Sequence, residues 1–129
     1  MFDEYREKLE SIGANSDKVF KRVAKLGAKQ FETEAKKLTD LEGLVDTGTY
    51  RRNWNGEQAE IEGEQAILCQ NNVEYASFLE NGHKYKNGKR WRGRFVGRRA
   101  LDEVRYWCIK KLDDIFDKMF TKYHKGFTQ

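Results

Sequence analysis

The sequence predicts an α+β domain in which one long helix near each end of the chain flanks antiparallel β-structure. Two long segments repeat apolar residues at helical spacing, one in each half of the chain. Between them, residues 53–72 alternate weakly about an acidic turn, as a β-hairpin does. A chain of 129 residues suffices for one hydrophobic core and not for two, so a single domain over residues 1–129 is expected.

Two helices are expected in the N-terminal part. Residues 1–14 should form a short amphipathic helix, because their apolar residues recur at helical spacing and Gly13 suits the position after a helix end. Asn15 or Ser16 can cap a second, longer helix, which should run to about Asp40. The apolar stripe of this helix comprises Phe20, Val23, Ala24, Gly27, Phe31, Ala35 and Leu38.

Three shorter elements are expected next. Asp46 or Thr47 can cap a short helix, whose outer face carries the paired arginines 51–52. The β-hairpin follows, with its turn near residues 62–64. The segment "VEYASFLENG" (73–82) then gathers apolar residues into one or two helical turns that end at an Asn-Gly pair.

The C-terminal part predicts the second long helix, from about Gly97 to Tyr123. At 1.5 Å per residue this helix would be ~40 Å long, so it should pack along the sheet or along the N-terminal helix. Trp54 and Trp107 lie within apolar patterns and are expected in the core. The stripe of the C-terminal helix comprises Leu101, Val104, Cys108, Leu112, Ile115 and Met119.

Positive charge is concentrated in the stretch "KYKNGKRWRGRFVGRR" (84–99). It holds eight Lys or Arg and no acid, whereas residues 1–83 hold 11 Lys or Arg against 16 Asp or Glu, and residues 100–129 hold 6 against 5. We expect a basic loop over residues 84–96, mobile because like charges repel and few apolar contacts hold it. The candidate partner-binding residues, for a protein interface or a DNA channel, are Lys84, Lys86, Lys89, Arg90, Trp91, Arg92, Arg94, Arg98 and Arg99.

Two roles compete for this basic stretch. Basic residues set among aromatic ones can neutralise phosphates and stack on bases, so a small nucleic-acid-binding module using residues 84–99 is one interpretation. Contact with another protein is favoured, because the positive charge forms one local block on a mildly acidic body and charge complementarity steers protein association. Trp91 lies between Arg90 and Arg92, so it is a candidate anchor for a partner.

Catalysis, a metal and a cofactor are not expected. His83 has no evident orienting partner or nucleophile near it in the sequence, and the glycines of the basic stretch do not form a phosphate loop. Cys69 and Cys108 lack metal-site or CxxC spacing, so they are expected as reduced core residues. No apolar run approaches the ~20 residues of a membrane span, and the acidic start does not resemble a signal peptide, so cytosolic synthesis without membrane contact is expected.

Three stretches resemble, in order and spacing, the tailed-phage tail-component family of head–tail joining and tail-completion proteins. They are "LVDTGTYRRNW" (44–54), "NNVEYASFLENGH" (71–83) and "GRFVGRRALDEV" (93–104). The chain departs from the family pattern at His83, where a Thr is usual, and at Arg99, where a Pro is usual. The family-motif positions singled out are Asp46, Thr47, Gly48, Arg51, Tyr75, Ala76, Glu80 and Gly82.

The resemblance implies a fold, a function and a set of partners. The implied fold is α+β, with a long N-terminal helix and a long C-terminal helix packed on a small curved antiparallel β-sheet. The implied function is that of a structural, non-catalytic neck protein of a phage or prophage, which completes the tail and joins it to the head. The implied partners are further copies in a ring oligomer, expected as a hexamer in the virion, and neighbouring connector, tail-terminator or tail-tube proteins. Phage DNA becomes a further partner if the basic loop lines the channel. The implied location is the neck or tail of the virion, with assembly in the host cytoplasm.

Overall fold

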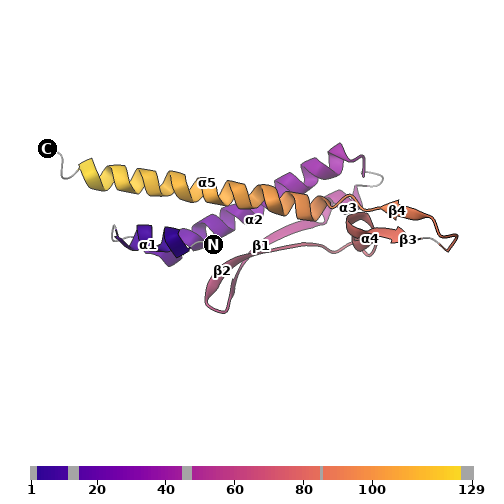
Figure 1. Cartoon of the computed structure of the whole chain (residues 1–129), viewed down its shortest axis with the longest axis horizontal. Coiled ribbons are helices and arrows are strands. Elements are labelled where there is room, and N and C mark those ends of the chain that lie inside the picture. The colour runs from indigo at the N-terminus through magenta and orange to yellow at the C-terminus, as the bar shows by residue number, and fades with distance from the viewer. Residues whose placement is uncertain (1–2, 12–14, 45–47, 85, 126–129) are drawn as a thin grey trace.

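Helix α2 (Ser16–Leu41) is the central element of the computed structural model: helix α5 (Val96–Lys125) and both strands of the larger sheet pack against it. Figure 1 shows an elongated molecule in which α2 and α5 run in opposite directions along the long axis. The structure describes residues 3–11, 15–44, 48–84 and 86–125, without the side chains of His83, Trp91 and residues 119–125. The prediction of two long helices on a small curved antiparallel sheet is confirmed.

Helix α2 begins where the sequence predicts. The side chain of Asn15 accepts a hydrogen bond from the backbone N–H of Lys18 at 3.2 Å, which satisfies one of the free amides of the first turn. The helix ends at Leu41, and Gly43 then takes a left-handed conformation with φ +66°. Its buried face follows the predicted stripe closely and includes Phe20, Val23, Ala24, Gly27, Ala28, Phe31, Ala35 and Thr39.

Strands β1 (Trp54–Ile61) and β2 (Glu64–Asn71) form the predicted antiparallel hairpin, with Trp54 opposite Asn71 and Ile61 opposite Glu64. The two turn residues, Glu62 and Gly63, both have positive φ, +52° and +80°, and two such residues match the right-handed twist of the flanking strands. The hairpin lies along α2, and a Cβ added at Gly56 would stand 2.2 Å from the carbonyl oxygen of Ala28. A glycine is therefore required where β1 meets α2.

Helix α5 covers another side of α2. A Cβ on Gly27 would lie 2.7 Å from the Cδ1 of Ile67 on β2 and 2.9 Å from the Sγ of Cys108 on α5, so the strand and the helix meet at this position of α2. Cys108 is buried and Cys69 is half-buried, and both thiols are free, as expected for reduced residues of the core region. The buried residues of α5 within its described side chains are Val96, Ala100, Val104, Cys108 and Leu112.

Trp54 joins the sheet to α2 through a polar contact inside the core. Its indole N–H donates to the hydroxyl oxygen of Thr39 at 2.9 Å, and the Thr39 hydroxyl donates to the carbonyl of Ala35 at 2.7 Å. Phe31 and Tyr50 approach the indole edge-on, with ring centroids 5.7 and 5.2 Å away. The core role predicted for Trp54 is confirmed, because its side chain is buried and its indole N–H has a hydrogen-bond partner.

Three short helices accompany the long ones in the described part of the chain. Helix α1 (Asp3–Ser11) packs on α2 and α5, and helix α3 (Thr49–Arg52) precedes β1. Helix α4 (Ala76–Asn81) matches the one or two turns predicted before Gly82. Gly48, with φ +80°, stands at the N-cap of α3; the two residues expected to cap this helix, Asp46 and Thr47, lie outside the described residues.

Candidate docking surface

The basic stretch forms a second hairpin, so the loop expected over residues 84–96 is corrected. Strand β3 (Gly82–Lys84) pairs antiparallel with strand β4 (Arg90–Arg92), and α5 already begins at Val96. Gly88, with φ +84°, supplies a left-handed residue in the connection. Each strand of this hairpin has only three residues, and their basic side chains give no alternation of apolar and polar residues from which a strand could be predicted. The hairpin projects from one end of the molecule (Figure 1).

Glu80 fixes this hairpin to the body. One carboxylate oxygen accepts the backbone N–H of Gly97 at 2.8 Å, and the other accepts that of Arg98 at 2.9 Å. The carboxylate therefore caps the start of α5, where free amides and the helix dipole favour a negative charge. A backbone hydrogen bond adds a second connection between the same two segments: the N–H of Phe95 donates to the carbonyl of Glu80 at 3.1 Å. A Cβ on Gly93 would lie 2.3 Å from that same carbonyl oxygen, so this crossing requires glycine.

The structure brings five of the predicted partner-binding residues together on this hairpin. Their side chains are exposed, and none of them forms an ion pair within the part of the chain that the structure describes. Unpaired basic side chains gathered on one projecting element give a local positive potential that attracts acidic partners. These five residues are Lys84, Lys86, Lys89, Arg90 and Arg92.

The three remaining arginines of the predicted set have contacts within the fold. Arg99 forms an ion pair with Glu42 at 2.7 Å, and Arg94 lies 4.0 Å from the same carboxylate. The guanidinium of Arg98 lies over the ring of Phe95, 4.9 Å from its centroid. The hydrogen bond from Arg99, with the charges of Arg99 and Arg94, lowers the pKa of the Glu42 carboxyl although partial desolvation opposes the shift. These contacts join the start of α5 to the end of α2.

Exposed aromatic rings lie at the same end of the molecule. Phe78 on α4 is 49% exposed and Tyr75 is 43% exposed, which leaves apolar surface beside a charged hairpin. Phe95, 36% exposed, has φ +52°, and this conformation is strained for a bulky residue. Sequence reasoning missed these rings as surface features.

The family-motif residues that the structure describes support the fold around the hairpin. The Nε of Arg51 donates to Asp40 at 2.8 Å, which ties α3 to the end of α2 on the outer face where this side chain was expected. The ring of Tyr75 lies 6.3 Å from that of Tyr50, and Gly82 has φ +91° between α4 and β3. The hydroxyl of Tyr50 is buried without a hydrogen-bond partner in the described part of the chain, and burial raises its pKa.

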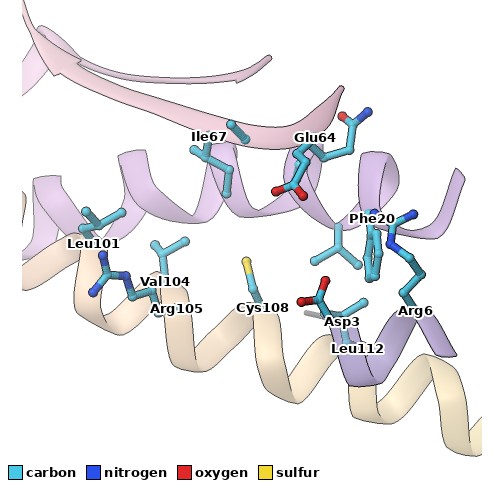
Figure 2. A pocket seen from close by; sticks show the side chains of 14 residues that line it. Asp3, Arg6, Phe20, Glu64, Ile67, Leu101, Val104, Arg105, Cys108 and Leu112 are labelled. Atoms are coloured by element: carbon cyan, nitrogen blue, oxygen red, sulfur yellow. The ribbon is translucent and has the colours of Figure 1, made fainter. Parts of the chain in front are cut away.

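A groove on another face was not predicted from the sequence. Figure 2 shows it between β2, α5 and the N-terminal part of α2, with α1 at one end. Its volume is about 440 Å³, and apolar side chains such as Phe20, Ile67 and Cys108 line it. Charged residues of both signs, Glu64 and Arg105 among them, also line it.

The described residues contain no group of three or more His, Cys, Asp or Glu side chains that could hold a metal ion. None of the helices, as far as they are described, is both long enough and apolar enough to span a membrane.

Two long helices on a small curved sheet, with an exposed basic hairpin at one end, define a small α+β protein. The family model described as "Bacteriophage HK97-gp10, putative tail-component" matches residues 3–82, more than half of the chain. The chain belongs to this HK97-gp10-like family of phage tail components, which confirms the family resemblance of its first two motifs. The third motif (93–104) and most of the basic hairpin lie beyond the matched residues. Comparisons with curated proteins and with solved structures gave no match.

Proposed function

We propose that the protein completes the tail at the neck of a phage or prophage particle and joins the tail to the head as a ring-forming oligomer. Family membership supports the coarser role of a tail component. The observation that carries the finer proposal is the hairpin of exposed, unpaired basic side chains, held at one end of the molecule by Glu80. Such an element is suited to docking and has no evident catalytic partner among the described residues.

Docking would use charge first and apolar contact second. The basic side chains steer the hairpin toward an acidic surface on a further copy, a connector protein, a tail terminator or a tail-tube protein. Trp91, at the centre of β4, is proposed as the anchor, because large aromatic residues dominate the binding energy of many interfaces. Subunits that associate head to tail close into a ring when the rotation between neighbours permits it.

Charge reversal in the producing bacterium tests this function. Lys89→Glu, Arg90→Glu and Arg92→Glu together should give filled heads and finished tails that do not join, visible as separate particles by electron microscopy. Trp91→Ala alone should weaken joining by at least ~2 kcal/mol in contact energy if it fills a pocket. Both proteins should keep the wild-type circular dichroism and melting temperature.

The matched control reverses three exposed lysines on the outer face of α2, Lys21→Glu, Lys25→Glu and Lys29→Glu. This control changes the net charge equally and should leave joining intact. Joined, infectious particles from both hairpin variants would show that the hairpin is only a solvated part of the surface.

A second candidate function rests on the same hairpin. Because it projects from the body, its basic side chains can also line a channel and contact passing DNA. The alternative of a nucleic-acid-binding module over residues 84–99 is therefore retained as a proposal to be tested by affinity and salt dependence.

A further inference from the structure

We propose that the basic hairpin of one copy (residues 82–84 and 86–92) docks against the acidic β1–β2 hairpin of a second copy, along the free edge of β2 and beside the groove of Figure 2. This inference rests on the proposed self-association and adds the two surfaces that meet. Four observations on this chain support it: charge, the unpaired strand edge, the groove, and the positions of the two hairpins.

The two hairpins carry opposite charge. Residues 53–83 contain six glutamates and no Lys or Arg, whereas residues 84–99 contain eight Lys or Arg and no acid. Four of those glutamates belong to the β1–β2 hairpin and its turn, and all four are exposed: Glu57, Glu60, Glu62 and Glu64. Opposite charges gathered on two separate elements of one chain favour association between copies.

The edge of β2 can accept another strand. In the described part of the chain β2 pairs with β1 alone, so its outer edge has no strand beside it. An unpaired edge presents backbone N–H and C=O groups that an extended segment can use. The proposed occupant is itself composed of short strands, β3 and β4, which likewise pair only with each other.

The groove lies beside this edge. Of the two strands of the larger sheet, only β2 contributes lining residues to the groove, from Glu64 to Ile67. Its floor is apolar, and Phe78 and Tyr75 at the basic end of the molecule expose apolar surface that would be covered on docking. Ile61 and Leu68 on the acidic hairpin are also about half exposed, at 51% and 46%. Apolar surface therefore accompanies the charges on both sides.

The two hairpins cannot meet within one chain. In Figure 1 the β1–β2 turn and the β3–β4 hairpin point toward opposite ends of the long axis. The contact must then join different copies. In the proposed arrangement the basic hairpin of each copy meets the acidic hairpin of the next copy, instead of two copies exchanging hairpins in a closed dimer, so the contact is heterologous. Repetition of the same contact generates a ring or an open chain of subunits.

Charge reversal and mixing of the purified full chain test this contact. One variant carries Glu57→Lys, Glu60→Lys and Glu62→Lys, and the other carries Lys86→Glu, Lys89→Glu and Arg90→Glu. All six side chains are exposed, and none forms an ion pair within the described residues. Sedimentation velocity at about 0.15 M salt measures association over a range of concentrations.

Each variant alone should associate at least about tenfold more weakly than the wild type, because like charges then face each other. An equimolar mixture should recover association, since the unchanged acidic hairpin of one variant meets the unchanged basic hairpin of the other. The Lys21, Lys25 and Lys29 reversal on α2 should associate like the wild type. Hydrogen exchange should also show slower exchange of the amides of residues 64–67 in the assembled protein.

Loss of association in both variants without recovery on mixing would overturn the proposal, and so would a wild type that remains monomeric at every concentration. These results leave the proposed function standing if the reversal of Lys89, Arg90 and Arg92 still prevents joining of heads and tails, because the partner of the basic hairpin would then be another neck protein. Normal joining by that reversal would count against the proposed function itself.

Discussion

Glu80 is the residue on which the position of the candidate surface depends most. Its two carboxylate oxygens hold the amides of Gly97 and Arg98, while its carbonyl holds the amide of Phe95. Loss of a helix cap costs about 0.5–2 kcal/mol, and a carboxylate at a helix N-terminus gains further from the dipole. We therefore expect Glu80→Ala to lower the free energy of unfolding by about 1–2 kcal/mol in urea titrations.

The matched control for this prediction is Glu103→Ala, which removes an exposed glutamate on α5, the helix whose start Glu80 caps. It should change stability by less than about 0.5 kcal/mol. Glu80→Gln should fall between the two, because its amide oxygen can still accept one of the hydrogen bonds. Equal stability of Glu80→Ala and Glu103→Ala would contradict the capping role.

Glu42 makes stability depend on pH. Its pKa in the folded protein lies below the ordinary value of 4.5, first because Arg99 donates a hydrogen bond to the carboxylate. A lowered folded pKa means that the stabilisation is fully present above the unfolded pKa and is lost as the pH falls through the folded value. Glu42→Gln should thus melt at a lower temperature than the wild type at pH 7.

The difference in melting temperature between Glu42→Gln and the wild type should shrink as the pH falls below about 4.5 and through the folded pKa. Thermal melts of both proteins across pH 3–7 measure it. A difference that stays constant over this range would show that the pair of Glu42 with Arg99 contributes no pH-dependent stability.

Residue-level prediction succeeded where cause and effect are close in the sequence. Asn15 caps the helix that begins at the next residue, and the turn of the first hairpin falls at Glu62-Gly63, where a turn was expected. The cap of α5 was not predictable, because Glu80 lies 17 positions before the amide of Gly97 that it holds. The positive φ of Phe95 was also hidden, since an aromatic residue carries no local signal for it.

At the scale of elements, the apolar stripe of α5 provides a direct test of packing. Leu112 is 2% exposed, so Leu112→Ala should destabilise the protein by ~2–5 kcal/mol through lost burial and a residual cavity. The same substitution at Leu41, which is 71% exposed at the end of α2, should cost less than about 0.5 kcal/mol. Denaturant unfolding of both variants measures the contrast, and similar costs would mean that α5 packs differently.

Periodicity predicted the long helices and the first hairpin, because each buries one face over many residues. It missed β3 and β4, which pair over only three residues each and alternate no apolar residues: three of their six residues are Lys or Arg. It also missed the groove, because a groove depends on how far apart β2 and α5 lie across α2, and no pattern within a single segment encodes that distance.

At the scale of the whole molecule, the affinity for DNA and its salt dependence distinguish a basic hairpin that contacts protein from one that contacts DNA. If the basic hairpin mainly contacts protein, the purified chain should bind duplex or single-stranded DNA only weakly. Physiological salt should abolish this binding, because binding releases counterions from the DNA and added salt opposes that release. Fluorescence anisotropy at several salt concentrations measures this, with the α2 lysine reversal as the control. Sub-micromolar affinity at about 0.15 M salt would favour the nucleic-acid-binding alternative.

The sequence revealed a basic block on an otherwise mildly acidic chain, but not where the block lies in space. That the β1–β2 turn and the β3–β4 hairpin point to opposite ends of the molecule follows from the antiparallel course of α2 and α5. Asp40 with Arg51, and Glu42 with Arg99, then fix the elements around the basic end. Such pairings join residues far apart in the chain, so only the assembled fold shows which surfaces a neighbour can reach.

Backbone hydrogen bonds at Leu79 and Glu80 hold both ends of the basic hairpin together, so this segment can be exchanged without disturbing the rest of the domain. The amide of Arg94 donates to the carbonyl of Leu79 at 2.8 Å, so the chain leaves the body and returns to it at nearly the same point. A segment whose ends are already held together can change its length or composition at little entropic cost to the rest of the domain. Recombination or engineering could therefore replace this segment with another peptide, while the two long helices and their sheet stay as they are.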